Sequence, residues 1–144
     1  MRTYYLFEIK DIVLKNYKNN YNELYELLES IYKLKNEDIV LGYDIFAKVA
    51  NQIDKDKISN YLRDKNIQSE NYICYNYTHI INDYYSDEST RLSINNSHIK
   101  IKTNKNAPSF FYNIRNFNNI FVCDFYNRDY FLLQETIYSS CVNV

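Results

Sequence analysis

The chain opens with an aromatic, apolar segment that runs directly into a helical pattern. Residues 3–9, Thr-Tyr-Tyr-Leu-Phe-Glu-Ile, have the composition of a buried strand. Lys10 and Asp11 follow at once, and from there apolar residues recur at steps of three and four as far as about Leu34. A strand followed immediately by a helix, with no glycine between them, predicts a fold that packs helices on a sheet.

The helical pattern after residue 10 carries one apolar stripe. Its members are Leu14, Tyr17, Tyr21, Leu24, Leu28 and Ile31. Asn19 and Asn20 interrupt it, and asparagine prefers helix caps to helix interiors. If the helix breaks there, Val13 and Tyr17 form a small apolar face on a short first helix.

The middle of the chain gives weaker patterns. Residues 43–51 alternate like a strand at Ile45, Ala47 and Val49, although a helix also fits this stretch. We predict a strand here, with Gly42 as the turn before it. The next predicted elements are a helix over 55–65 capped by Asp54, a strand over 72–77, and a polar, acidic loop from Asn82 to Thr90.

The second half of the chain predicts two hairpins and one helix. The first hairpin has strands over 91–94 and 98–102, and the second has strands over 120–125 and 130–133. Between them we predict a helix with Pro108 in its first turn. Its buried residues are Phe110, Phe111, Ile114 and Phe117. Asn95 and Asn96 can take the positive φ values of a tight turn in the first hairpin. Residues 134–144 have no clear pattern, and we expect a frayed tail.

Together these elements indicate one α/β (α+β) domain over residues 1–133. We expect a mixed or mostly antiparallel sheet with about three helices packed on it. A chain of 144 residues is long enough to bury a substantial core in one domain.

Composition narrows the classes of function. The net charge of −1 argues against a general nucleic-acid binder, although a local basic patch is still compatible with it. No apolar stretch approaches the roughly 18 residues of a membrane span, and charged residues interrupt the N-terminal apolar run, so we expect a cytoplasmic protein. Cys74, Cys123 and Cys141 are odd in number and widely spaced, and we expect free thiols.

Few residues suggest catalysis. The single glycine excludes phosphate-binding loops, which need several. His79 and His98 have no ligand spacing typical of a metal site, and Cys74 and His79, five residues apart on a strand, would point to opposite faces. We therefore expect no enzyme, no cofactor and no metal. A hydrolase or transferase with a Cys/His site would require proximity that only the fold could provide.

Two charged groups have alternative interpretations. Asp83, Asp87 and Glu88 could bind a cation, but their spacing favours a solvated acidic loop. Lys100 and Lys102, followed by Lys105, could contact phosphate, but alternation on a strand favours a solvated face.

The 17 tyrosines also have two interpretations. Abundant Asn, Lys, Ile and Tyr are typical of an AT-rich genome. Alternatively, Tyr72, Tyr75 and Tyr77 could stack on bases in a single-stranded nucleic-acid-binding module.

A fold without catalytic residues usually works by binding, and aromatic residues on an exposed helix face are natural anchors. Tyr17, beside Val13, is the best candidate. The stripe that joins Tyr17 to Leu14 and Tyr21 supports core packing equally well.

Both ends of the chain contain runs that match one known family. They are Tyr4 to Asp11, Tyr17, the helix with Glu23, Leu24 and Leu27, the strand His98 to Ile101, Phe110 with Phe111, and Phe121 to Asn127 followed by Tyr130 and Leu132. In their order and spacing they resemble the sporulation inhibitor of replication protein family, SirA. The similarity covers most of the chain but is thin in the middle.

The resemblance implies a small α/β protein that is not an enzyme. Family members bind the N-terminal domain of the replication initiator DnaA and stop new rounds of chromosome replication during sporulation, in low-GC Gram-positive hosts. The family's partner surface maps to Val13 and Tyr17, and we include Leu14 and Asn16 in the candidate surface. Such a protein is expected to act as a monomer, without a membrane and without direct nucleic-acid binding.

Two departures from the family pattern bear on the partner surface. Val13 stands where the family has phenylalanine, and Asn19 and Asn20 occupy the region of a family glycine. These differences concern affinity and partner specificity rather than the fold.

Overall fold

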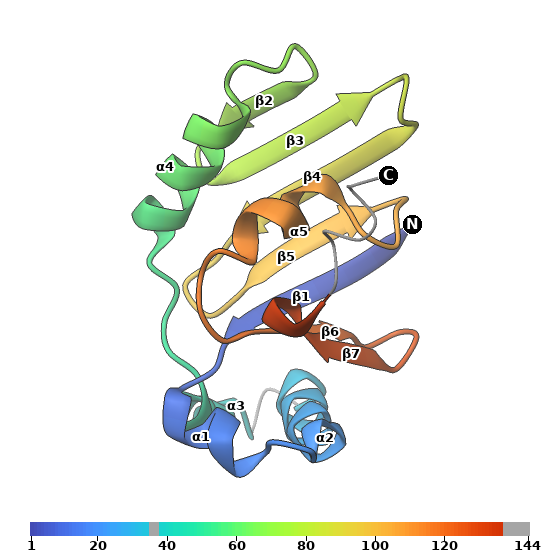
Figure 1. The fold of residues 1–144 in the computed structure, drawn as a ribbon. Coiled ribbons are helices and arrows are strands. Elements are labelled where there is room, and N and C mark those ends of the chain that lie inside the picture. Colours follow the sequence, from blue (N-terminus) through green and yellow to red (C-terminus); the bar gives the residue numbers. More distant parts are fainter. Residues whose placement is uncertain (35–37, 137–144) are drawn as a thin grey trace.

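The computed structural model describes residues 1–34 and 38–136 of the chain. Its centre is a sheet of seven strands in the order β2-β3-β4-β5-β1-β6-β7 (Figure 1). Every neighbouring pair of strands is antiparallel. The predicted class, α+β with a mostly antiparallel sheet, is therefore confirmed.

Along the described part of the chain, one strand is followed by four helices, four strands, one helix and two strands. They are β1 (Arg2–Glu8), α1 (Asp11–Asn16), α2 (Tyr21–Tyr32), α3 (Ile39–Val49), α4 (Lys55–Asn66), β2 (Tyr72–Tyr75), β3 (Thr78–Asp83), β4 (Glu88–Ile94), β5 (Ile99–Thr103), α5 (Ser109–Ile114), β6 (Ile120–Asp124), β7 (Asp129–Leu132) and the 3₁₀ turn η2 (Leu133–Glu135). No helix within the described ranges combines the length and apolarity needed to cross a membrane.

β1 lies inside the sheet, between β5 and β6. Leu6 is paired with Ile99 on one side and with Val122 on the other. Tyr4 and Leu6 are buried on one face, and Phe7 is buried on the other. A strand with helices on both faces needs a nearly continuous apolar sequence, and this explains the aromatic opening of the chain.

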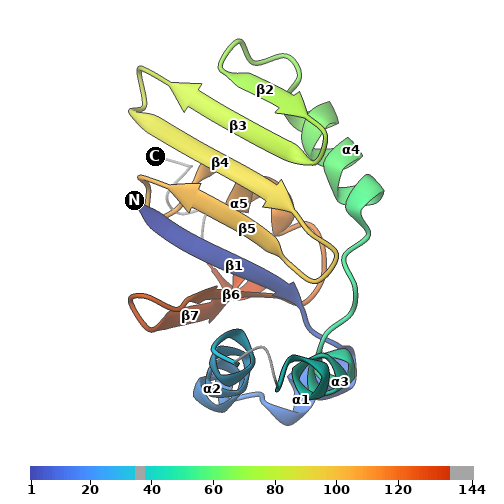
Figure 2. The ribbon, with the colours of Figure 1, turned by 180° about the vertical axis from the view of Figure 1, so that it is seen from behind.

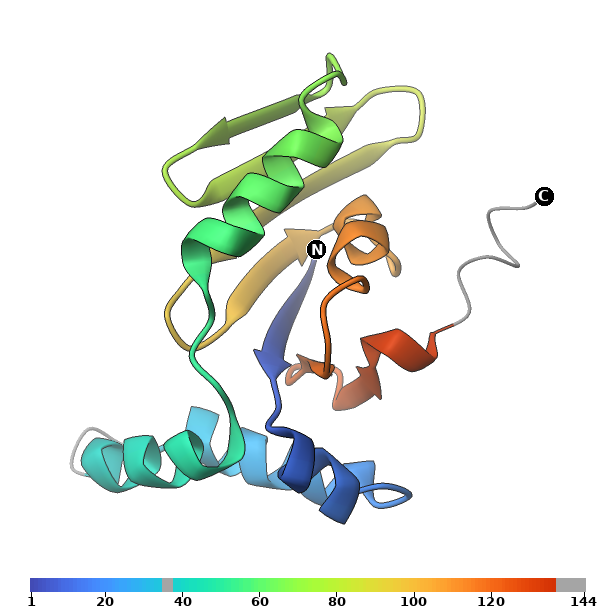
Figure 3. The ribbon, with the colours of Figure 1, turned by 60° about the vertical axis from the view of Figure 1, so that its left-hand side comes forward.

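Each face of the sheet has its own core and its own helices. In the first core, α4 and α5 contribute Ile58, Leu62, Phe110, Phe111 and Ile114. In the second core, α2 and α3 contribute Leu24, Tyr25, Leu28 and Val49, together with Ala50 directly after α3. Figure 3 shows α1, α2 and α3 together at one end of the sheet, away from α4 and α5. Seen from behind, none of the described helices lies over β2 to β5 on the second face (Figure 2).

The predicted strand over 43–51 is wrong, because this stretch belongs to helix α3. Phe46 and Val49, three residues apart, pack on the second core, and helical spacing thus prevails over alternation. Gly42 marks no turn. It is buried inside the helix, where a β-carbon would collide with the end of the Leu34 side chain.

The described residues contain five α-helices, more than the three that were predicted. One addition is α3. The other comes from the break that Asn19 and Asn20 suggested. α1 ends at Asn16, and Asn19, with a φ of 70°, lies in the turn that leads to the start of α2 at Tyr21.

The predicted acidic loop from Asn82 to Thr90 is wrong in part. β3 extends to Asp83 and β4 starts at Glu88. Glu88 is buried and accepts hydrogen bonds from the Thr90 hydroxyl (2.6 Å) and from the Ser109 backbone N–H (3.0 Å). Since Pro108, the N-cap residue of α5, has no side-chain donor or acceptor, Glu88 replaces a local cap and holds the helix on the sheet.

Turn positions also differ from the prediction. The strand predicted over 72–77 ends at Tyr75, because Asn76, with a φ of 50°, turns the chain into β3. Neither Asn95 nor Asn96 has positive φ, since a four-residue loop rather than a tight turn joins β4 to β5.

The predicted cap of α4 is confirmed. The Asp54 side chain accepts a hydrogen bond from the Lys57 N–H at 3.2 Å.

The C-terminal tail predicted from residue 134 starts later. Gln134 and Glu135 belong to η2. The Gln134 side chain accepts from the Ile120 N–H at 2.9 Å and donates to the Phe117 carbonyl at 2.5 Å, and so joins the turn to β6. Residues 137–144, with Cys141, lie outside the described part of the chain.

Asp124 connects the first strand to the last hairpin. It is 1% exposed and accepts from Arg2 Nε at 3.0 Å and from Asn127 Nδ2 at 2.7 Å. Burial alone would raise the pKa of this carboxyl group, but the Asn127 and Arg2 donors outweigh it and hold the pKa below its usual value. The stabilisation is therefore present at neutral pH and lost as pH falls below about 4.

We expect Asp124→Ala to lower the free energy of unfolding by about 2–4 kcal/mol, because buried donors lose their acceptor. Urea unfolding at neutral pH measures this. Asp129 is the matched control, since its carboxylate lies 3.3 Å from Arg2 but its side chain is 55% exposed. Asp129→Ala should cost less than about 1 kcal/mol. Equal losses in the two variants would contradict the role given to Asp124.

Candidate protein-interaction surface

Helix α1 leaves the end of β1 and is held there by backbone contacts. The Lys10 N–H donates to the Val49 carbonyl (3.0 Å), and the Asn51 N–H donates to the Glu8 carbonyl (2.8 Å). These bonds tie the start of α1 to the end of α3. None of the residues of α1 is fully buried, so the helix lies on the outside of the second core.

The structure places the four predicted partner-binding residues together on and just after this helix. Val13, Leu14 and Tyr17 are half-buried against the second core, and Asn16 is exposed. Tyr17, at the C-cap of α1, thus combines the two roles that the sequence left open: part of its side chain packs inward and part faces solvent. Ile12, 66% exposed, is an apolar neighbour that sequence reasoning missed.

A larger exposed apolar surface lies on α3. Ile39, Val40, Leu41 and Tyr43 are 42%, 69%, 59% and 64% exposed, and we call these four residues the α3 surface. Sequence reasoning missed it because a turn was predicted at Gly42 and a strand over 43–51, so residues 39–41 were not assigned to a helix. The helix has only two charged residues, Asp44 and Lys48, and this would have been the available signal.

An aromatic groove adjoins the α3 surface, and Tyr43 belongs to both. The groove encloses about 180 Å³ and is lined by Tyr5, Phe7, Leu28, Ile31, Tyr32, Tyr43, Phe46, Ser97 and His98. Pockets for small-molecule ligands usually enclose roughly 300–1,000 Å³. The groove is therefore sized for a single apolar side chain of a partner.

The groove carries no charge at neutral pH. Burial, and then the hydrogen bond between the Tyr5 and Tyr32 hydroxyl groups, raises the pKa of Tyr5 to about 12. Burial, and then the charge of Lys100, lowers the pKa of His98 below its usual value. Both rings stay neutral, which favours apolar contacts over recognition of an ion.

The fold creates a polar cluster around His79 that the sequence did not predict. Cys74 and His79 are cross-strand partners, because the turn at Asn76 separates β2 from β3. The expectation that they point to opposite faces was wrong for this reason. The Cys74 Sγ lies 3.8 Å from His79 Nε2, while Ser59 Oγ lies 3.0 Å from Nε2 and the Tyr72 hydroxyl 2.7 Å from Nδ1.

This cluster is a satisfied core group. His79 is fully buried, and both ring nitrogens have hydrogen-bond partners. Burial, and then the charge of Arg63, lowers the pKa of His79 to about 4, so the ring is neutral and a weak base at neutral pH. Among the described residues, no three His, Cys, Asp or Glu side chains are grouped as metal ligands.

The three tyrosines proposed for base stacking do not share one surface. Tyr72 is buried beside His79, and the Tyr77 hydroxyl donates to Asp56 at 2.6 Å. Tyr75 alone of the three, 47% exposed, lies on the uncovered face of the sheet.

Comparison with known proteins does not assign the chain to a family. No family model matches this chain, and no curated protein matches it.

We expect the His79 imidazole to titrate with a midpoint near pH 4 in a two-dimensional NMR titration of ring resonances. Because the folded pKa lies below the usual value of about 6.5, stability is fully present above that pH and declines as pH falls toward 4. A midpoint at 6.5 or above would contradict the buried neutral ring.

Proposed function

We propose that this protein acts by binding another protein, and that the partner is the N-terminal domain of the replication initiator DnaA. In this proposal it inhibits chromosome replication initiation during sporulation. It acts in the cytoplasm as a monomer, without a cofactor, a metal or catalysis. The assignment of the partner rests on the resemblance of both ends of the chain to the SirA family.

The observation that supports protein binding is the α3 surface with its groove. Four large apolar side chains are exposed within about the first one and a half turns of one helix, and an uncharged groove continues from Tyr43. Protein interfaces are built from apolar and aromatic anchors near pockets of this size. Exposed apolar residues scattered singly would carry no such meaning.

The α1 residues extend the proposed contact. Val13, Leu14 and Tyr17 are held against the second core, so their exposed parts are rigid. A rigid aromatic anchor loses little conformational entropy on binding. Val13 stands in place of the family's phenylalanine and gives a smaller apolar contact on this helix. Ile12 and the α3 surface supply further exposed apolar area for the partner.

Inhibition requires only that the bound protein cover a surface of DnaA that initiation uses. The proposal therefore assigns binding, and not chemistry, to these residues. Affinity is expected to depend on a few anchors rather than on the whole contact area.

We expect Tyr17→Ala to weaken binding to the DnaA N-terminal domain by about 2 kcal/mol or more, as for an interface anchor. Titration calorimetry with the full chain measures this. Tyr17→Phe is the control, because it keeps the ring packed on the second core. Thermal unfolding of both variants is measured in parallel, and a large loss of stability with unchanged affinity in Tyr17→Ala would make Tyr17 a core residue only.

We expect Leu41→Ser to weaken the same binding by about 1 kcal/mol or more without lowering stability, because Leu41 is 59% exposed. Ile67→Ser is the matched control: Ile67 is 57% exposed but lies at the end of α4, on the other helical layer. Affinity that falls equally in both variants would refute the α3 surface. A folded wild-type protein that does not bind the domain would refute the partner.

A further inference from the structure

The uncovered face of the sheet carries a row of hydroxyl, aromatic and basic side chains. Cross-strand pairing places Tyr75 beside Thr78, Thr78 beside Ser93, Ser93 beside Lys100, and Lys100 beside Tyr5. The row crosses five strands, from β2 to β1. With about 4.8 Å between neighbouring strands, it spans about 19 Å.

A second row lies next to the first on the same face. It runs through Ile73, Ile80, Arg91, Lys102 and Thr3, again from β2 to β1. Arg91 and Lys102 are exposed, and Lys100 in the first row is half-exposed. Figure 2 looks onto this face and shows no helix across β2 to β5. We call the two rows the open face.

The open face is positively charged although the whole chain has a net charge of −1. It has three cations and no carboxylate in either row. None of Arg91, Lys100 and Lys102 forms an ion pair with another side chain in residues 1–34 and 38–136. Their charge is therefore available to an anionic partner.

Aromatic rings lie directly beside these cations. Arg91 Nη2 donates to the Tyr75 hydroxyl at 2.7 Å, which holds the exposed Tyr75 ring next to the charge. The Lys100 ammonium lies 5.7 Å from the centre of the Tyr5 ring, at the border between the open face and the aromatic groove. Cations that follow a backbone and an aromatic platform for bases are the two components of single-strand recognition.

We propose that the open face binds single-stranded nucleic acid. Arg91, Lys100 and Lys102 contact successive phosphates, and a base stacks on Tyr75. Unpaired bases are required because stacking on a flat sheet needs an exposed base face. An acidic peptide would satisfy the cations but would leave the aromatic platform unused. This activity does not depend on the protein contact proposed for α1 and α3. Tyr5, which also lines the aromatic groove, is the one residue of the two rows that both surfaces share.

The test is fluorescence anisotropy of a labelled oligothymidylate of about 12 nucleotides, titrated with the full chain. Three phosphate contacts predict a slope of about −2 for the logarithm of affinity against the logarithm of salt, that is, about 20-fold weaker binding at 200 than at 50 mM salt. Lys102→Gln should reduce the slope by about 0.7.

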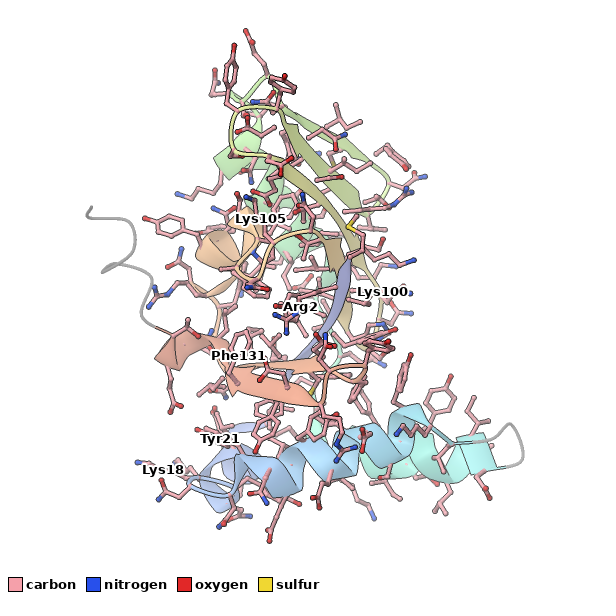
Figure 4. All side chains as sticks on the ribbon, turned by 90° about the vertical axis from the view of Figure 1, so that its right-hand side faces the viewer. Arg2, Lys18, Tyr21, Lys100, Lys105 and Phe131 are labelled. Carbon is pink, nitrogen blue, oxygen red and sulfur yellow. The ribbon has the colours of Figure 1, made fainter. Side chains whose placement is uncertain are left out.

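Lys105 provides the matched control for charge. Figure 4 shows Lys100 and Lys105 on opposite sides of the sheet, with Lys105 on the side of α5. Lys105→Gln should leave both affinity and slope unchanged. Equal losses in Lys102→Gln and Lys105→Gln would overturn the proposal, because they would reflect net charge alone.

Tyr75 provides the test of stacking. Tyr75→Leu should weaken binding by about 5- to 100-fold, whereas Tyr75→Phe keeps the ring and should remain within about twofold of the wild type. Circular dichroism confirms that each variant is folded. Absence of oligonucleotide binding by the wild type at low salt would overturn the proposal, as would equally tight binding of polyglutamate.

Discussion

The position of β1 inside the sheet is the constraint on which the rest of the structure depends. β1 pairs with β5 on one side and β6 on the other, so it joins the hairpin β6–β7 to the strands β2 to β5. Its side chains enter both cores, Tyr4 and Leu6 in the first and Phe7 in the second. Contacts between residues about a hundred positions apart must therefore form before either core is complete, and Arg2 with Asp124 strengthens this closure.

Both proposed surfaces arise from the unequal cover that the helices give to the sheet. α1, α2 and α3 pack over one end of the second face, where Phe121 and Cys123 of β6 are buried. None of the described helices covers the strands β2 to β5 on that face. Their exposed positions are polar or basic, apart from Ile73 and Tyr75 of β2. α3 has apolar residues on both its inner and its outer side. A helix that is apolar all round is stable on a surface when a further partner covers it.

Elements that depend on local patterns could be predicted, and elements that depend on distant contacts could not. The hairpin of β4 and β5 follows from strict alternation, and α4 follows from the Asp54 cap and helical spacing. α3 was assigned to the wrong class because its short apolar run fits both periods, and only packing of Phe46 and Val49 on the second core decides between them. Glu88 was assigned to a solvated loop because its donor, the Ser109 N–H, lies far along the chain.

By itself, the sequence determined the fold class, the buried first strand and the hairpins β4–β5 and β6–β7, since the spacing of apolar residues is a local property. Its single glycine also excluded a glycine-rich phosphate loop. The sequence also pointed to the first helix, where Tyr17 lies half-buried. Only the tertiary structure decided which strands are neighbours, which tyrosines reach solvent and that Cys74 meets His79. The physical reason is that exposure and pairing depend on what packs against a residue, and those partners are distant in the chain.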